Sequence, residues 1–200
     1  MSAPVPRILA LAGSPRRHGN SERLLDACLD GAREAGAEID ELIVAEAGIA
    51  PCRGCNTCSL SGECVVRDGM TDVYPRLDAA DAVVVATPVY FATVPAVLKA
   101  LYDRCQPYWA RRYVLKQEPP ARRPGGVLVV GGGGDPFGRG CAVTTTRSVF
   151  AVLGIDCLGE VAAEADAPCD IGRQRGALDE ALTLGARLVA EARPRAHGTS

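Results

Sequence analysis

Histidine is scarce in this sequence, and both long apolar runs and an excess of one charge are missing. The two histidines argue against a Ser-His-Asp triad or a histidine-rich metal site. The formal net charge is only -2 and no basic stripe is present, so we expect no nucleic-acid partner. No apolar run approaches the ~18 residues that a membrane span needs, and the first residues lack the layout of a signal peptide. We therefore expect no membrane association and a cytoplasmic location.

Cysteine, in contrast, is abundant, and the chain is long enough to build an ordinary core. With 200 residues, of which 48% are hydrophobic, we expect one domain over residues 1–200. The nine cysteines should be mostly reduced in a cytoplasmic protein, and their odd number argues against a simple disulfide framework. Four of them fall between positions 52 and 64, which suggests a metal, an iron–sulfur cluster or redox work.

The apolar segments alternate between strand-like and helix-like patterns. This alternation predicts an α/β fold, a doubly wound five-stranded parallel sheet of flavodoxin-like order 2-1-3-4-5 with helices on both faces. A cysteine loop at 52–64 and an irregular excursion at 106–125 interrupt it. The expected strands cover residues 5–12, 39–45, 81–86, 127–130 and 155–162, and the expected helices cover residues 20–36, 70–80, 95–106, 141–153 and 171–192.

Three unusual loops, at 13–21, 87–93 and 131–140, follow the carboxyl ends of strands, where such sheets bind ligands. The first opens a helix, whose N-terminal N–H groups favour a phosphate. The hydroxyls of Ser14 and Ser21 and the amide of Asn20 can donate to phosphate oxygens, and Arg16 adds a charged fork. Neither a Walker loop nor a GxGxxG pattern is present, and a polar turn without a ligand stays open as the alternative.

Residues 13–21, with the sequence GSPRRHGNS, resemble the phosphate loop of the NADPH-dependent FMN reductase group, which has a flavodoxin-like fold. Residues 87–91, with the sequence TPVYF, resemble the second signature of that group, which continues with Lys99 and Asp103-Arg104. The resemblance implies an FMN site. It assigns the phosphate to Ser14, Arg16, Asn20 and Ser21, and the flanks of the isoalloxazine to Pro88, Val89, Tyr90 and Phe91.

The third loop begins with four consecutive glycines at 131–134, followed by Asp135 and Pro136. We expect Gly131 and Gly132 to let backbone N–H groups reach the polar edge of the flavin, because a glycine allows close approach. A flexible turn is the alternative for this loop.

The clustered cysteines, Cys52, Cys55, Cys58 and Cys64, form the pattern C-x2-C-x2-C-x5-C. Four thiolates in one compact run fit a [4Fe–4S] cluster, whereas zinc sites usually pair two separated knuckles. The pattern resembles the iron–sulfur flavoproteins, a branch of the same flavin family whose cluster exchanges electrons with FMN. Reduced thiols that only shape the loop, a zinc site and a redox disulfide remain open as alternatives.

The resemblance implies an FMN-dependent oxidoreductase. Electrons would come from NAD(P)H or a reduced ferredoxin-like carrier and pass to a small-molecule acceptor, through the [4Fe–4S] cluster if it is present. We expect no catalytic side chain, because the flavin carries the chemistry. The alternatives are an electron-transfer flavoprotein that acts only between protein partners, a clusterless NAD(P)H:FMN or quinone reductase, and a zinc-stabilised binding module. The family usually assembles, so a homodimer or homotetramer is expected.

Overall fold

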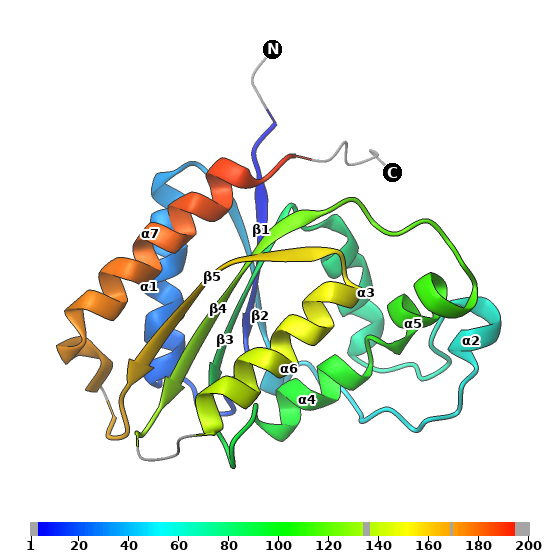
Figure 1. Cartoon of the computed structure of the whole chain (residues 1–200), viewed down its shortest axis with the longest axis horizontal. Helices are drawn as coiled ribbons and strands as arrows, with labels where there is room; N and C mark the ends of the chain where they lie inside the picture. The colour runs from blue at the N-terminus through cyan, green and yellow to red at the C-terminus, as the bar shows by residue number, and fades with distance from the viewer. Residues whose placement is uncertain (1–3, 134–136, 169, 195–200) are drawn as a thin grey trace.

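The computed structural model describes residues 4–133, 137–168 and 170–194, and these form a sandwich of helices around one parallel sheet (Figure 1). The strand order β2-β1-β3-β4-β5 confirms the predicted doubly wound, flavodoxin-like topology. All four neighbouring pairs are parallel. The strands are β1 (Arg7–Ala12), β2 (Glu38–Ile43), β3 (Ala82–Pro88), β4 (Arg123–Gly131) and β5 (Ile155–Glu164).

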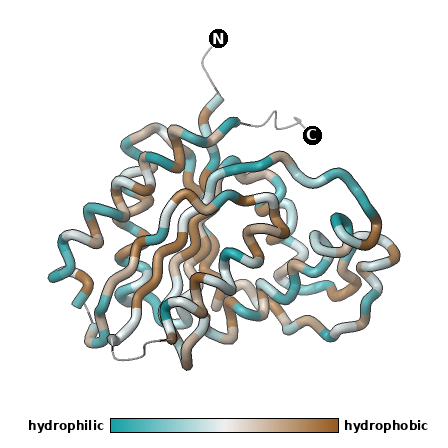
Figure 2. Tube along the Cα trace, viewed as in Figure 1, coloured by the Kyte–Doolittle hydropathy of each residue, from teal (hydrophilic) through white to brown (hydrophobic). Residues whose placement is uncertain are grey.

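Helices cover the sheet on both faces, as the alternating sequence predicts. In β1, Ile8 and Ala10 pack on one face, and Leu9 and Leu11 pack on the other, because successive side chains of a strand point in opposite directions. The central strands are therefore mostly apolar, as Figure 2 shows. One face carries α1 (Asn20–Glu34) and α7 (Arg175–Glu191), and the other carries α3 (Met70–Ala79), α4 (Ala96–Asp103) and α6 (Gly138–Val152).

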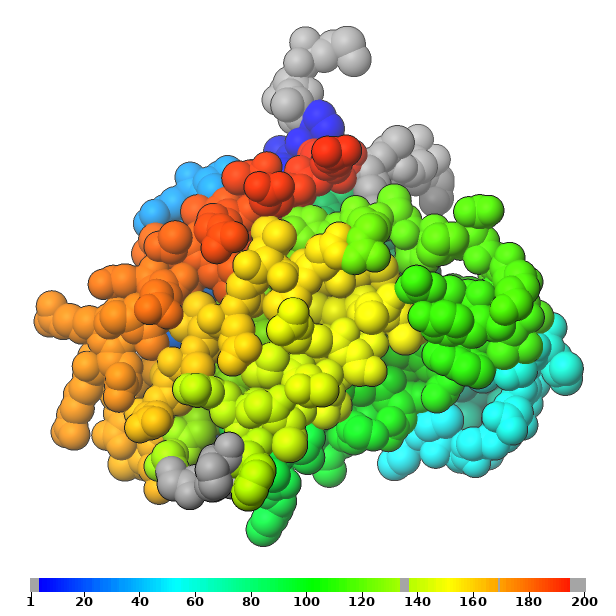
Figure 3. All heavy atoms as spheres, in the orientation of Figure 1, coloured from blue at the N-terminus to red at the C-terminus, as the bar shows by residue number. Residues whose placement is uncertain are grey.

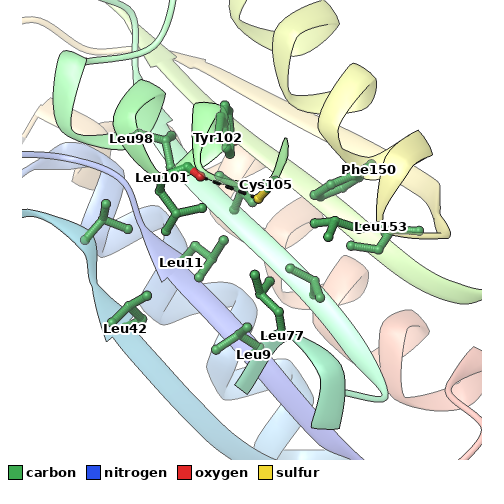
Figure 4. Packing of buried hydrophobic residues seen from close by; sticks show 14 of the residues in the cluster. Leu9, Leu11, Leu42, Leu77, Leu98, Leu101, Tyr102, Cys105, Phe150 and Leu153 are labelled. Carbon is green, nitrogen blue, oxygen red and sulfur yellow. Dashed lines mark hydrogen bonds between the residues drawn. The ribbon is translucent and has the colours of Figure 1, made fainter. Parts of the chain in front are cut away.

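The core between α4 and α6 is closely packed and holds few polar atoms (Figure 4). Tyr102 donates to Thr146 Oγ1 over 3.0 Å, and Thr146 donates in turn to the Ala142 carbonyl over 2.9 Å, so both hydroxyls are satisfied. The Cys105 thiol donates to the Leu101 carbonyl over 3.5 Å. Burial raises the pKa of Cys105 to about 12, so this thiol stays protonated and acts as a small apolar side chain.

The segment at 106–125, expected to be irregular, is partly regular. It contains α5 (Gln106–Trp109), a π-helix (Ala110–Val114) and the first residues of β4. Tyr108 fixes α5 because its hydroxyl donates to Asp78 on α3 over 2.9 Å. The start of β4 escaped sequence analysis because Pro124, Gly125 and Gly126 are poor strand formers, and pairing with both neighbouring strands overrides that preference.

Short elements complete the chain. The cysteine loop contains α2 (Cys58–Ser61), and two 3-10 turns follow β2 and β5, at Val44–Glu46 and Asp170–Arg173. In the described part of the chain, no helix has both the length and the apolar character that crossing a membrane requires.

We predict that Gly185→Ala destabilises the contact between α1 and α7. A Cβ at this position would lie 1.8 Å from the Cys28 carbonyl oxygen, and a backbone atom cannot move aside cheaply. We expect the free energy of unfolding to fall by about 1–3 kcal/mol in a denaturant titration. Gly176→Ala in the same helix is the control, because a Cβ there meets nothing within 4 Å. Equal effects of the two substitutions would contradict the packing argument.

Candidate functional site

The three loops singled out in the sequence meet around one cavity of about 240 Å³ at the carboxyl ends of the strands. All the predicted cofactor residues except Phe91 line it. These are Ser14, Arg16, Asn20, Ser21, Pro88, Val89, Tyr90, Gly131 and Gly132. The later part of the third loop, Gly134, Asp135 and Pro136, lies outside the described residues.

The Ser14 hydroxyl holds the first loop in a tight turn through the backbone of Arg16, whose side chain is exposed. The Ser14 hydroxyl accepts a hydrogen bond from the Arg16 amide over 3.0 Å and donates to the Arg16 carbonyl over 3.1 Å, which closes a tight turn. Helix α1 begins at Asn20, with Gly19 as its N-cap and no side-chain cap, so its first N–H groups are not satisfied by a capping side chain. The exposed Arg16 guanidinium forms no ion pair within residues 4–133, 137–168 and 170–194. This combination suits an anion.

Below this turn, Glu22 anchors the loop to α1. Its buried carboxylate accepts hydrogen bonds from Arg17 over 3.0 Å and from the His18 amide over 2.5 Å. His18 adopts a left-handed backbone conformation with φ of 56°, and the bond to its amide helps to hold that conformation. Burial works to raise the pKa of Glu22, but the bonds from Arg17 and His18 outweigh it and lower the pKa. Arg17, paired with Glu22 and Glu46, is thus engaged within the protein.

Asn20 ties the first loop to a fourth wall of the cavity that sequence analysis missed. Its amide nitrogen donates to the Ala167 carbonyl over 2.9 Å, and its oxygen accepts from the Ile171 amide over 3.3 Å. Within the described ranges, these bonds leave one of its two amide hydrogens for a ligand. The wall consists of Ala165, Asp166 and Pro168, after β5. The parallel topology itself was the available signal, because the fifth strand ends at the same edge as the others.

The second loop forms a tight tip beyond β3. Tyr90 and Thr93 exchange backbone hydrogen bonds of 2.8 and 3.1 Å, and the two residues between them, Phe91 and Ala92, both adopt left-handed conformations. The Phe91 side chain is fully exposed and does not line the cavity, in contrast to Val89 and Tyr90. The assignment of Phe91 to the flank of a flavin therefore stays a prediction, and the side of the loop that faces the cavity is formed by Pro88, Val89 and Tyr90.

A second cavity, of about 300 Å³, collects all four clustered cysteines. Cys52 and Cys55 are exposed, whereas Cys58 and Cys64 are half-buried. The wall opposite the cysteine loop comes from the end of α4 and from α5, and includes Arg104, Pro107 and Trp109. In Figure 3 these two segments, the cysteine loop in cyan and α5 in green, lie together at one end of the molecule.

The neighbouring thiols affect the pKa of Cys58. Burial raises the pKa of Cys58, and the nearby charges of Cys64, Cys52 and Cys55 add to the effect. The pKa of Cys55 is lowered by the hydrogen bond from Thr57, whose hydroxyl donates to the sulfur over 3.5 Å. Among the described residues, however, no three Cys, His, Asp or Glu side chains are arranged as ligands for a metal ion. The thiols share a cavity without converging on one point.

Arg104 closes the base of the cysteine loop. Its guanidinium forms a fork-to-fork pair with Asp68, at 2.6 and 3.0 Å, and it also donates to the carbonyls of Ala50 over 2.9 Å and Val66 over 3.1 Å. These three partners flank the loop on both sides. The hydrogen bond from Arg104 holds the pKa of Asp68 below its usual value, although burial opposes this shift. The cysteine loop thus depends on Arg104, which sequence analysis identified only as part of the second family signature.

A family model described as NADPH-dependent FMN reductase matches residues 6–167. The chain belongs to that family. The match begins just before β1 and extends past β5, so it includes the whole cysteine loop and the lining of the first cavity except Pro168.

This FMN reductase family member is similar to proteins named iron-sulfur flavoproteins. One from Methanosarcina thermophila is 37% identical over 126 residues, which are 63% of this chain and 63% of the relative. One from Methanocaldococcus jannaschii is 32% identical over 148 residues, which are 73% of this chain and 71% of the relative. The matched region thus covers less than two thirds of the length of the first relative and slightly more than two thirds of the length of the second.

A solved structure supports the fold of the FMN reductase family member. The NAD(P)H:quinone oxidoreductase from Methanothermobacter marburgensis superposes with a TM-score of 0.67 at 20% identity, covering 92% of this chain and 98% of that one. At this level of identity, the likeness shows the flavodoxin-like fold alone.

We predict that Glu22→Gln loosens the first loop in a pH-dependent way. We expect a loss of about 1–2 kcal/mol in the free energy of unfolding near pH 7, the lower part of the range for hydrogen bonds to charged groups, because water screens the 40% exposed Arg17. Because the folded pKa of Glu22 lies below its ordinary value of 4.5, its contribution is present above about pH 4.5 and is lost as the pH falls through the folded pKa.

Chemical denaturation of both proteins between pH 3 and pH 8 measures this difference. The two stability curves should be separated at neutral pH and should converge in acid. A constant separation over the whole range would show that the charge of Glu22 is not what stabilises the loop. Asp30→Asn on the exposed surface of α1 is the control, since its pair with Arg33 is exposed on both sides.

Proposed function

We propose that this chain is an FMN-dependent oxidoreductase that passes electrons from NAD(P)H or a reduced carrier to a small acceptor. The observation that carries the proposal is the convergence of four loops on one cavity. One wall of this cavity holds a helix N-terminus and Arg16, which has no ion-pair partner in the part of the chain that the structure describes. The family assignment and the flavodoxin-like topology support the same conclusion. Ligands of doubly wound sheets bind at this edge.

The lining of the cavity divides into a part suited to phosphate and a part suited to a planar ring. Arg16 and the first N–H groups of α1 would bind the phosphate, with Ser21 and the remaining amide hydrogen of Asn20 beside them. Val89 and Tyr90 offer an apolar wall, and the backbone at Gly131 and Gly132 can approach a polar ring edge closely. Bound FMN would supply the redox chemistry, since it accepts a hydride and gives up electrons singly or in pairs. The side chains therefore bind and orient the cofactor and need not transfer protons.

We propose that the cysteine loop holds a [4Fe–4S] cluster through Cys52, Cys55, Cys58 and Cys64. Three features of the loop fit this group: the donor set is four thiols, all four line one cavity, and a buried guanidinium lies in its wall. Among the described residues the thiols do not form a ligand set, so binding a cluster would require them to move closer together. Such a centre would carry single electrons. The names of the curated relatives favour a cluster over zinc or free thiols.

Two further properties belong to the proposal. A homodimer or homotetramer is expected from the resemblance to the family. A cytoplasmic location is expected from the sequence, and its reducing conditions would keep the cysteines as thiols.

We predict that Arg16→Ala weakens FMN binding by about tenfold to a hundredfold. The substitution removes charge-assisted hydrogen bonds worth about 1.5–3 kcal/mol, and each 1.4 kcal/mol is tenfold in affinity. Quenching of FMN fluorescence on titration into flavin-free protein measures the change. Arg23→Ala is the control, because Arg23 lies on α1, outside this cavity, and is also exposed. Equal affinities of Arg16→Ala and the wild type for FMN would contradict the assignment of the phosphate site to this loop.

Turnover separates this function from that of an electron carrier. An oxidoreductase with its own substrate site should oxidise many equivalents of NADPH or NADH when a soluble quinone is added. A carrier should remain oxidised with the nicotinamide and become reduced only when reduced ferredoxin is supplied. In either assay, Arg16→Ala should lose the signal at low FMN concentration and regain it with excess FMN.

We predict that anaerobically purified protein contains about four irons and about four sulfides per chain, together with flavin absorption bands. Cys55→Ser should lose the iron and sulfide while retaining FMN, because Cys55 lies in the other cavity. Cys141→Ser is the control, an exposed cysteine outside the loop, and should keep the full iron content. Flavin bands without iron would refute the proposed cluster and favour the alternative of a clusterless reductase.

A further inference from the structure

A pocket of about 230 Å³ lies at the edge of the sheet where the strands begin, and it shares no lining residue with the two cavities described above. Ile155, the first residue of β5, lines it, and so does Arg122, which directly precedes β4. The proposed FMN cavity lies at the other edge, where the strands end. The pocket is smaller than the range of about 300–1,000 Å³ that is typical of sites for drug-sized ligands, so it suits a small ligand.

Three arginines from three segments of the chain line this pocket. Arg112 comes from the π-helix, Arg122 from the residue before β4, and Arg147 from α6. Among the described residues of the lining, Asp156 is the one carboxylate, so two of the three positive charges are not balanced there. The whole chain carries a formal net charge of -2, so this positive excess is local. Like charges that are brought together repel one another, and a bound anion would offset that repulsion.

Two of the arginines are held in place by the protein. A terminal nitrogen of Arg112 donates to the Ala151 carbonyl at the end of α6 over 2.7 Å, and the guanidinium lies over the Tyr113 ring, 5.1 Å from its centroid. Arg122 forms a fork with Asp156, in which Nε donates over 2.6 Å. Within residues 4–133, 137–168 and 170–194, the other terminal nitrogen of each guanidinium forms no hydrogen bond. Both arginines therefore offer N–H donors from fixed positions.

The third arginine, Arg147, is not used within the described part of the protein. It is exposed, and its guanidinium forms neither an ion pair nor a hydrogen bond with any residue that the structure describes. A cation is favourable near the C-terminal end of a helix, but Arg112 already binds the Ala151 carbonyl there. Burial raises the pKa of the Cys157 thiol, although the charge of Arg147 opposes this shift, so the thiol stays neutral and supplies no counter-charge.

The segment that carries Arg112 is itself unusual. A π-helix is rare in proteins and is frequently found at functional sites. Here the π-helix at Ala110–Val114 places two neighbouring arginines in different surroundings. Arg111 donates to the Gly62 carbonyl at the end of α2 over 2.8 Å, whereas Arg112 lines the pocket. One arginine is thus used to hold the cysteine loop, and the next is available to a ligand.

We propose that this pocket is a binding site for a phosphate dianion, either inorganic phosphate or the phosphate group of a small organic molecule. Arg112 and Arg122 would donate from their remaining terminal nitrogens, and Arg147 would supply the third guanidinium. Guanidinium groups match the geometry of phosphate oxygens and form short, charge-assisted hydrogen bonds with them. The site requires neither FMN nor the cysteine loop, so it is independent of the proposed function.

The test is isothermal titration calorimetry of the full chain with two probes, inorganic phosphate and glycerol phosphate. The titrations are run at constant ionic strength and at about pH 8, where a phosphate group carries close to two negative charges. We expect Arg147→Gln to weaken the binding of both probes by about tenfold, because one of three guanidinium groups is lost. Asp156→Asn should strengthen it by about twofold to fivefold, because the carboxylate that competes for Arg122 is removed.

Two further variants show where the phosphate binds. Arg187→Gln is the matched control, because Arg187 is also exposed and also donates to a backbone carbonyl, that of Leu158 over 3.5 Å, but does not line the pocket. Its affinity should equal that of the wild type. Arg16→Ala removes the arginine of the first loop, which is the other candidate phosphate site, and should leave binding at this pocket unchanged.

Opposite effects of Arg147→Gln and Asp156→Asn, with no effect of Arg187→Gln, would support the site. A preference for glycerol phosphate would assign it to a phosphorylated metabolite, and a preference for inorganic phosphate would assign it to the free ion. Equal affinities of Arg147→Gln and the wild type would overturn the proposal, as would binding that is lost only in Arg16→Ala. A wild type that binds neither probe with a Kd below about 10 mM would also overturn it. None of these results depends on whether the chain binds FMN.

Discussion

The parallel direction of all five strands is the constraint on which the rest of this protein depends. Each backbone ladder runs the same way, so every loop that follows a strand emerges at one edge of the sheet. The Gly13 amide continues the ladder beyond β1 by donating to the Ala86 carbonyl over 2.8 Å. The helices on both faces leave this edge uncovered. A cavity formed by four separate loops follows directly from that arrangement.

The cysteine loop is not held by the backbone hydrogen bonds of the sheet. It leaves the sheet after β2 and returns to α3, and the ion pair of Arg104 and Asp68 joins its two ends. A buried ion pair adds little net stability, since removing two charges from water offsets most of their attraction. What it provides here is a defined arrangement, because the guanidinium can satisfy its donors only when both ends of the loop are in place.

The sheet order, the helix faces and the three loops around the first cavity can be predicted from the sequence, because hydrophobic periodicity and the order of elements carry that information. Features that depend on contacts between distant residues cannot. The wall at Ala165, Asp166 and Pro168 carries no local motif and belongs to the cavity only through the position of β5. The start of β4, with Pro124 and two glycines, is a strand only because its neighbours pair with it.

The roles of the loop residues show the same limit. The sequence presents Ser14, Arg16 and Asn20 as equivalent polar groups, whereas the structure gives Ser14 to the turn, Asn20 to the opposite wall, and leaves Arg16 without an ion-pair partner in the described ranges. Which polar group is used internally depends on partners up to 151 positions away. The cysteine spacing, likewise, indicates that the four thiols share a site, but the residue that closes the loop lies 36 positions from its partner aspartate.

The hydrogen bonds of Arg104 at the base of the cysteine loop limit how this part of the chain can vary. Arg104 contacts positions 50 and 66 through their carbonyl oxygens, which every amino acid possesses. Only Arg104 and Asp68 contribute side chains. These hydrogen bonds therefore constrain the side chains at positions 104 and 68 and do not depend on the side chains at positions 50 and 66. Substitutions at positions 50 and 66 can thus leave the two ends of the loop in register.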